Sequence, residues 1–106
     1  MGTGQVRGSI PEEVVRYLRK GSIEPKPTGM YDITGRRIYV GDIVEFYFDS
    51  VRGHSLEPNE GFIRMRDIVA EIHGRIFFVC RYGAAFAERH VAYCRVIGTD
   101  PALIDS

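Results

Sequence analysis

The sequence predicts a mainly β fold, of the β-dominated α+β class, with one helix near the N-terminus. Short apolar runs rich in Val, Ile, Phe and Tyr recur from residue 28 onward, and Gly-, Asp- and Pro-containing turns separate them. One earlier segment has helical periodicity instead. The chain has 106 residues, of which 44% are hydrophobic, and this length allows one domain with a single modest core.

The N-terminal part divides into two segments. Residues 1–8 contain three glycines and little to bury, which predicts a flexible lead. Residues 9–27 are expected to hold a helix of about three turns and then an extended linker that contains proline. The signals for the helix are a Ser–Glu capping box and an apolar stripe at four-residue steps: Ser9, Glu12, Ile10, Val14 and Leu18.

The remaining residues, 28–106, are expected to form the β domain. In the run over residues 43–48, Val44, Phe46 and Phe48 share one face, which we expect to be the core face. Residues 32–35 predict a tight turn, and residues 49–61 predict an irregular loop. Strands are expected over residues 36–40, 43–48, 62–72, 75–82 and 91–97.

The later strands carry more specific signals. Apolar residues fall on odd positions and then on even positions within residues 62–72, which predicts a β-bulge or bend near Arg66 and Asp67. His73 and Gly74 fit a two-residue hairpin turn. The unbroken apolar run in residues 75–82 predicts a central strand covered on both faces, whereas residues 83–89 fit a helical turn or a loop. Together these elements predict a small, strongly bent sheet or a partly closed SH3-like β-barrel of about five or six strands.

Composition excludes several classes of protein. Lys+Arg and Asp+Glu both number 14, and a net charge of zero argues against a dedicated polyanion binder. Two cysteines are too few for a disulfide scaffold and fit a reducing cytoplasm, where we expect the protein to be located. No apolar run approaches the roughly 18 residues of a membrane span, so no membrane association is expected.

A family resemblance is carried by the segment TGMYDITGRRIYVGDIVEF, residues 28–46, and by the sequence VIG near the C-terminus. The chain resembles the YopX-like family of small phage and prophage proteins. The resemblance implies a β-dominated fold, a phage or prophage origin and a location in the host bacterial cell, and it implies no particular activity. The turn and core structure explains Asp32, Tyr39 and Asp42 of the motif, and the sequence leaves open whether they have a further role. The matching residues are Thr28, Gly29, Asp32, Gly35, Ile38, Tyr39, Gly41, Asp42, Ile43, Val44, Val96, Ile97 and Gly98.

Candidates for catalysis and metal binding are weak. The residues with suitable side chains, Cys80, Cys94, His73 and His90, lack the spacing of a zinc site. A nucleophilic Cys94 with His90 or His73 as its base lacks any catalytic signature around it. The acidic residues are scattered, and no glycine-rich loop precedes a helix. The sequence therefore predicts a protein that is not an enzyme and has no metal or cofactor.

Charge placement suggests two binding functions. Residues 73–97 contain four arginines and one glutamate, a local charge of +3, and residues 41–72 contain seven acidic residues and three arginines, a local charge of −4. Such polarity favours self-association, so the leading hypothesis is a homo-oligomeric β module that binds itself or a host or phage protein. The alternative is a single-stranded nucleic-acid-binding β-barrel module, because 12 of the 14 basic residues are arginine. Its candidate contact residues are Arg75, Arg81, Tyr82 and Arg95.

Overall fold

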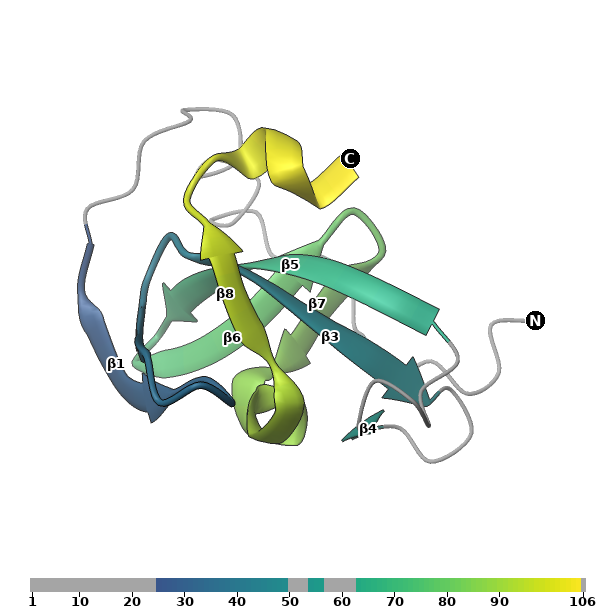
Figure 1. Ribbon diagram of the computed structural model, residues 1–106. Helices are drawn as coiled ribbons and strands as arrows, with labels where there is room; N and C mark the ends of the chain where they lie inside the picture. The colour runs from purple at the N-terminus through teal and green to yellow at the C-terminus, as the bar shows by residue number, and fades with distance from the viewer. Residues whose placement is uncertain (1–24, 50–53, 57–62, 106) are drawn as a thin grey trace.

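The structure, a computed structural model, describes residues 25–49, 54–56 and 63–105, and these residues form two antiparallel sheets (Figure 1). Strands β1 (Pro27–Tyr31) and β2 (Arg37–Tyr39) pair as a two-stranded ribbon. The larger sheet has the order β4–β3–β5–β6–β7, with β8 also paired to β3. Its strands are β3 (Ile43–Asp49), β4 (His54–Leu56), β5 (Ile63–Ile72), β6 (Arg75–Cys80), β7 (Gly83–Phe86) and β8 (Arg95–Gly98). The prediction of a mainly β fold is confirmed.

Some expectations concern residues that the structure does not describe. The predicted lead at residues 1–8 and the predicted helix within residues 9–27 lie outside the described residues, which include only the end of the linker. Most of the expected loop at residues 49–61 lies outside them as well. The helical elements in the described residues are three short 3-10 turns: η1 (Ala87–Arg89), η2 (Val91–Tyr93) and η3 (Pro101–Asp105).

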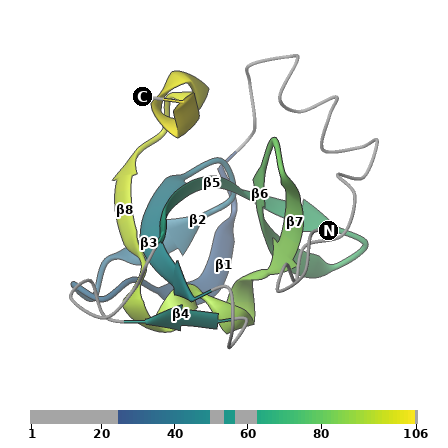
Figure 2. The ribbon, with the colours of Figure 1, turned by 90° about the vertical axis from the view of Figure 1, so that its right-hand side faces the viewer.

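Strand β5 is shared between two halves of the sheet. Its residues 63–68 pair with β3, and its residues 68–72 pair with β6, so Ile68 alone takes part in both ladders. The opposite edge of β3 is also divided, because its first half pairs with β8 and its second half with β4. These staggered pairings bend the sheet (Figure 2). Among the described strands no ladder joins β7 to β4 or β8, so these strands form a bent sheet and not a closed barrel.

The bent sheet is buried on both faces. One core cluster contains Phe46 and Phe78 and lies against η1 and η2, which contribute Ala87 and Val91. The other contains Ile68 and Val79 and packs against Leu103 and Ile104 of η3. Val44, Phe46 and Phe48 all belong to the first cluster, which confirms the predicted core face of β3. The expectation that β6 is covered on both faces is confirmed by Phe78 and Val79, neither of which is exposed.

Of the β-bulge or bend that was predicted near Arg66 and Asp67 of β5, the β-bulge is wrong. The strand keeps an unbroken register with β3 and with β6 across Arg66 and Asp67. Odd-numbered Met65 and Val69 face the first cluster, whereas even-numbered Ile68, Ala70 and Ile72 face the second. The change of apolar phase therefore comes from a regular strand whose two faces are buried over different lengths.

Asp32 joins the turn after β1 to the edge of β8. Its Oδ1 accepts hydrogen bonds from the backbone N–H groups of Thr34 and Arg36, each at 2.9 Å, and from Thr34 Oγ1 at 2.7 Å. Its Oδ2 accepts the N–H of Val96 at 2.9 Å. Burial alone would raise the pKa of Asp32, but the hydrogen bonds from Thr34, Val96 and Arg36 together hold it below its usual value. The carboxylate thus stabilises the turn and occupies the outer edge of β8.

A second aspartate forms the turn between β2 and β3. The N–H of Tyr39 donates to Asp42 Oδ2 at 2.8 Å, and the N–H of Asp42 donates to the Tyr39 carbonyl at 3.0 Å. Gly41 supports the same turn with a φ of 98° and donates its N–H to the Val69 carbonyl of β5. Burial raises the pKa of Asp42 despite the hydrogen bond from Tyr39. Asp32, Tyr39 and Asp42 thus all have structural roles.

Three other turn regions can be compared with the sequence. The two-residue hairpin at His73 and Gly74 is confirmed, with φ values of 51° and 81°. Residues 83–89, which fit a helical turn or a loop, form β7 and then η1. The strand expected over residues 91–97 begins only at Arg95, because η2 precedes it and the N–H of Cys94 bonds to the Val91 carbonyl.

Candidate nucleic-acid interface

The outer surface of β5, β3 and β8 carries arginine and tyrosine side chains in register. Tyr47 of β3 is opposite Arg64 of β5, and Glu45 of β3 is opposite both Arg66 of β5 and Arg95 of β8. Directly opposed residues of an antiparallel pair point to the same face, so these five side chains share one face of the sheet. We call this face, completed by Tyr93 of η2, the arginine–tyrosine platform: Glu45, Tyr47, Arg64, Arg66, Tyr93 and Arg95.

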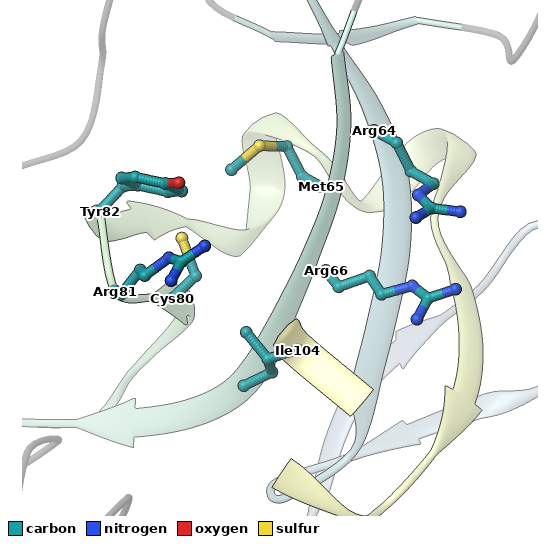
Figure 3. Close-up of a pocket in the computed structure, with 7 residues that line it drawn as sticks. All are labelled: Arg64, Met65, Arg66, Cys80, Arg81, Tyr82 and Ile104. Carbon is teal, nitrogen blue, oxygen red and sulfur yellow. The ribbon is translucent and has the colours of Figure 1, made fainter. Parts of the chain in front are cut away.

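One hollow flanks the platform on the side of β6 and has a volume of about 210 Å³. We call it the Tyr82 hollow, and it is lined by Arg64, Met65, Arg66, Cys80, Arg81, Tyr82 and Ile104. Figure 3 shows Arg81 and Tyr82 on one side of β5, with Met65 pointing toward Tyr82. Arg64 and Arg66 extend from β5 in the other direction, across β3. The arginines are therefore spread along a surface and do not converge on one point.

A second hollow, which we call the Tyr93 hollow, lies at the β8 side of the platform. It has a volume of about 140 Å³ and is lined by Ile33, Glu45, Tyr47, Tyr93 and Arg95. These residues come from four segments, namely the turn after β1, strand β3, η2 and strand β8. Ile33 is held there because its N–H donates to the Cys94 carbonyl at 2.8 Å. The hollow therefore depends on the contact between the first turn and the last strand.

The arginines of the surface have different partners. Arg66 donates from Nε to Glu45 Oε2 at 2.9 Å and from Nη1 to the Leu103 carbonyl at 3.1 Å, which fixes its direction. Arg81 lies over the ring of Tyr82, with 5.2 Å from Cζ to the ring centroid, and 59% of Tyr82 is exposed. Arg64 and Arg95 are exposed and form no ion pair within the described residues. Of the described residues that line the two hollows, four are arginines and one is a carboxylate.

Three of the four contact residues expected from the sequence line one of the two hollows. Arg81 and Tyr82 line the Tyr82 hollow, and Arg95 lines the Tyr93 hollow. The fourth, Arg75, lines neither hollow. Its Nη2 donates to Glu88 Oε1 at 2.8 Å, and its guanidinium lies 3.9 Å from the centroid of the Phe86 ring. The structure therefore separates Arg75 from the other three.

Sequence reasoning missed Arg64, Arg66 and Tyr47, whereas Tyr93 could be recognised as an aromatic residue among the arginines of residues 73–97. The two arginines were counted within residues 41–72, whose summed charge of −4 concealed them. The alternation of Ile, Arg, Met and Arg at residues 63–66 was a usable signal, because it puts both arginines on one face of a strand. Charge summed along a segment does not distinguish the two faces of a sheet.

The buried thiol and imidazole do not favour nucleophilic chemistry. Burial raises the pKa of Cys94 to about 12, and the negative charge of Asp32 acts in the same direction. Such a thiol holds almost no thiolate at neutral pH, so Cys94 is a poor nucleophile. The His90 ring is fully buried and stacks on Phe46, with 4.7 Å between the ring centroids. Within the described residues no group of three His, Cys, Asp or Glu side chains is placed to hold a metal ion.

Two further observations do not concern the candidate surface. In the part that the structure describes, every helix is too short or too polar to cross a membrane. Comparison with protein-family models, curated proteins and solved structures found no match to this chain.

Proposed function

We propose that the protein is a non-enzymatic β module that binds single-stranded nucleic acid on the arginine–tyrosine platform. The observation that carries this proposal is the row of opposed side chains in which Arg66 and Arg95 flank Glu45 and Arg64 is opposite Tyr47. Arginines contact phosphates, and tyrosine rings provide faces on which bases stack. The two hollows at the ends of this row are places where a base can be buried from solvent.

Because the arginines are spread along the surface, an extended nucleic-acid strand suits them better as a ligand than a compact anion does. Arg81 lies beyond one side of β5, Arg64 and Arg66 extend over β3, and Arg95 lies on β8. A chain of phosphates can contact these positions one after another, whereas a single phosphate cannot. Because the chain has no net charge, this proposal predicts weak binding that depends strongly on salt.

The test is a fluorescence-anisotropy titration of labelled single-stranded DNA and RNA at low and at physiological salt. We expect dissociation constants in the micromolar range at low salt and a steep loss of affinity as salt increases. Arg64→Gln and Arg95→Gln should each weaken binding and reduce the slope of log affinity against log salt by about one. Arg75→Gln is the matched control, because Arg75 is an exposed arginine outside both hollows.

Two results would contradict the proposal. One is the absence of binding to either kind of strand at low salt. The other is an Arg75→Gln variant that weakens binding as much as Arg64→Gln does, because binding would then follow total charge and not the platform.

The second candidate is a homo-oligomeric or protein-binding module of a YopX-like phage or prophage protein in the host cytoplasm. The family proposal rests on the motif residues alone, and with it we propose an SH3-like, partly closed barrel for the whole chain. An exposed apolar pair, Tyr31 at 53% and Ile33 at 47%, favours a protein contact beside the turn after β1. Light scattering tests it: Ile33→Glu should lower the mass of an oligomer, and a monomeric wild-type protein at tens of micromolar would exclude self-association.

A further inference from the structure

The Tyr93 hollow combines aromatic and apolar walls with one carboxylate. Tyr47 and Tyr93 provide rings, Ile33 provides an apolar side chain that is 47% exposed, and Glu45 brings the carboxylate. Walls of this kind suit a flat, partly apolar ring such as a nucleobase, which can stack on a tyrosine. Glu45 and Arg95 then provide the polar groups with which such a base can form hydrogen bonds.

Glu45 is held in a fixed direction with one oxygen available. Arg66 donates to its Oε2, and Arg66 is itself fixed by its bond to the Leu103 carbonyl. No hydrogen bond among the described residues reaches Oε1 of Glu45, and 21% of this side chain is exposed. An ionised carboxylate only accepts hydrogen bonds. A base in this hollow therefore has to present donors to Glu45.

The bases of DNA and RNA differ in this respect along their Watson–Crick edges. Guanine presents two adjacent donors, the N1–H and the N2 amino group. Adenine and cytosine each place a ring-nitrogen acceptor beside their amino group, and uracil and thymine place their single N–H between two carbonyl oxygens. A carboxylate repels these acceptors. It can accept both guanine donors, one at Oε1 of Glu45 and the other at the second lone pair of Oε2, beside the bond from Arg66.

We infer that the Tyr93 hollow is a guanine-selective subsite of the nucleic-acid surface, with Glu45 as the residue that selects the base. This inference rests on the proposed function. Arg95 lies beside the hollow on β8, where it can contact the phosphate of the same nucleotide, and Arg64 lies opposite Tyr47 for a neighbouring phosphate.

A protein ligand could use the same carboxylate through an arginine side chain. The surroundings favour the nucleotide, because Arg64, Arg66 and Arg95 share the face with Glu45. Three guanidinium groups repel a cationic peptide and attract phosphates. An arginine-containing peptide is therefore one of the competing outcomes that the experiment has to separate.

The experiment measures binding by fluorescence anisotropy, with labelled oligouridine strands of ten nucleotides that carry one central guanosine, inosine, adenosine or cytidine. We expect the guanosine strand to bind the full-length protein about tenfold more tightly than the adenosine and cytidine strands. Inosine lacks the N2 amino group, so its strand should lose a large part of this advantage. Glu45→Gln should remove the preference for guanosine over adenosine and cytidine. It should also raise the affinity for plain oligouridine, because it removes one negative charge from an arginine-rich face.

Glu88→Gln is the control variant, because Glu88 is an exposed glutamate that lines neither hollow. We expect it to keep the full preference for guanosine. Thermal melting followed by circular dichroism checks that Glu45→Gln is folded, since the change alters the bond to Arg66. The series of four strands on the unaltered protein tests the inference even if that variant does not fold.

The outcomes separate this inference from the proposed function. Equal binding of all four strands would overturn the guanine subsite and leave nucleic-acid binding in place. A guanosine preference that survives Glu45→Gln would also overturn it. Failure of every strand to bind at low salt would overturn both, and binding of a labelled arginine-rich peptide in that case would assign the hollow to a protein ligand instead.

Discussion

Replacing Asp32 by alanine should destabilise the fold strongly. The change removes the acceptor of four hydrogen bonds, from Thr34 N, Thr34 Oγ1, Arg36 N and Val96 N. The bond to Val96 is buried, so its loss leaves a donor without its partner and costs about 1–3 kcal/mol. Thr34 and Arg36 are exposed, and water can replace part of their bonds, so these three together add about 1–2 kcal/mol. We expect a total loss of about 3 kcal/mol, which is a large part of the roughly 5–15 kcal/mol of a typical domain.

Urea unfolding followed by far-UV circular dichroism measures this loss, with the slope against urea expected to stay constant. At roughly 4 °C per kcal/mol, the melting temperature should fall by about 12 °C. Asp100→Ala is the control, since it removes an exposed bond of the same kind, from Ala102 N to Asp100 Oδ1 at 3.0 Å, and should change stability by less than about 0.5 kcal/mol. A loss below about 1 kcal/mol for Asp32→Ala would refute the reasoning that this carboxylate holds the first turn on the last strand.

The folded-state pKa of Asp32 is below its ordinary value of 3.8, so its contribution to stability is complete above that pH and disappears as the pH falls through the folded-state pKa. Asp32→Asn should therefore flatten the acid side of the stability–pH curve. A variant curve that runs parallel to the wild-type curve at acid pH would contradict this. Gly74→Ala should cost roughly 1 kcal/mol in urea unfolding, because φ is 81° there, and His73→Asn in the same turn should change stability by less than about 0.5 kcal/mol. A pKa of about 12 in place of 9.0 lowers the thiolate fraction of Cys94 at pH 8 by about a thousandfold. In a Cys80→Ala variant, a disulfide reagent should therefore modify Cys94 at the unfolding rate, and modification within seconds in the native protein would contradict this.

Local turn chemistry made part of the fold predictable. The turn at Asp32 and the hairpin at His73 and Gly74 depend on residues that are close together in the chain, so the sequence alone is enough to predict them. The face of β3 that contains Phe46 was also predictable, because alternation along one strand is a local property. The wrong β-bulge at Arg66 and Asp67 arose because two different core clusters bury the two faces of β5 over different lengths. The segments that form these clusters are distant in the sequence, so no local pattern indicates how far each face is buried.

The candidate surface was predictable only in part for the same reason. Arg81 and Tyr82 are adjacent in the chain, and their shared location follows from that. Arg64 and Tyr47 lie opposite each other only because β3 and β5 pair in one particular register. The sequence grouped Arg75 with Arg81, Tyr82 and Arg95, and it did not indicate the contact of Arg75 with Glu88, because that contact depends on how η1 follows β7.

The division of β5 between two ladders has a consequence for the order of folding. The β5–β6 ladder is local, since a two-residue turn connects its strands, and it can form early. Strand β8 pairs with β3 across about 50 positions of sequence, as with Val96 and Val44, so its loop closes late and at a higher entropic cost. Arg95 belongs to that late strand, as one wall of the Tyr93 hollow. We therefore expect a bound strand to slow amide hydrogen exchange in β8 more than in the β5–β6 hairpin.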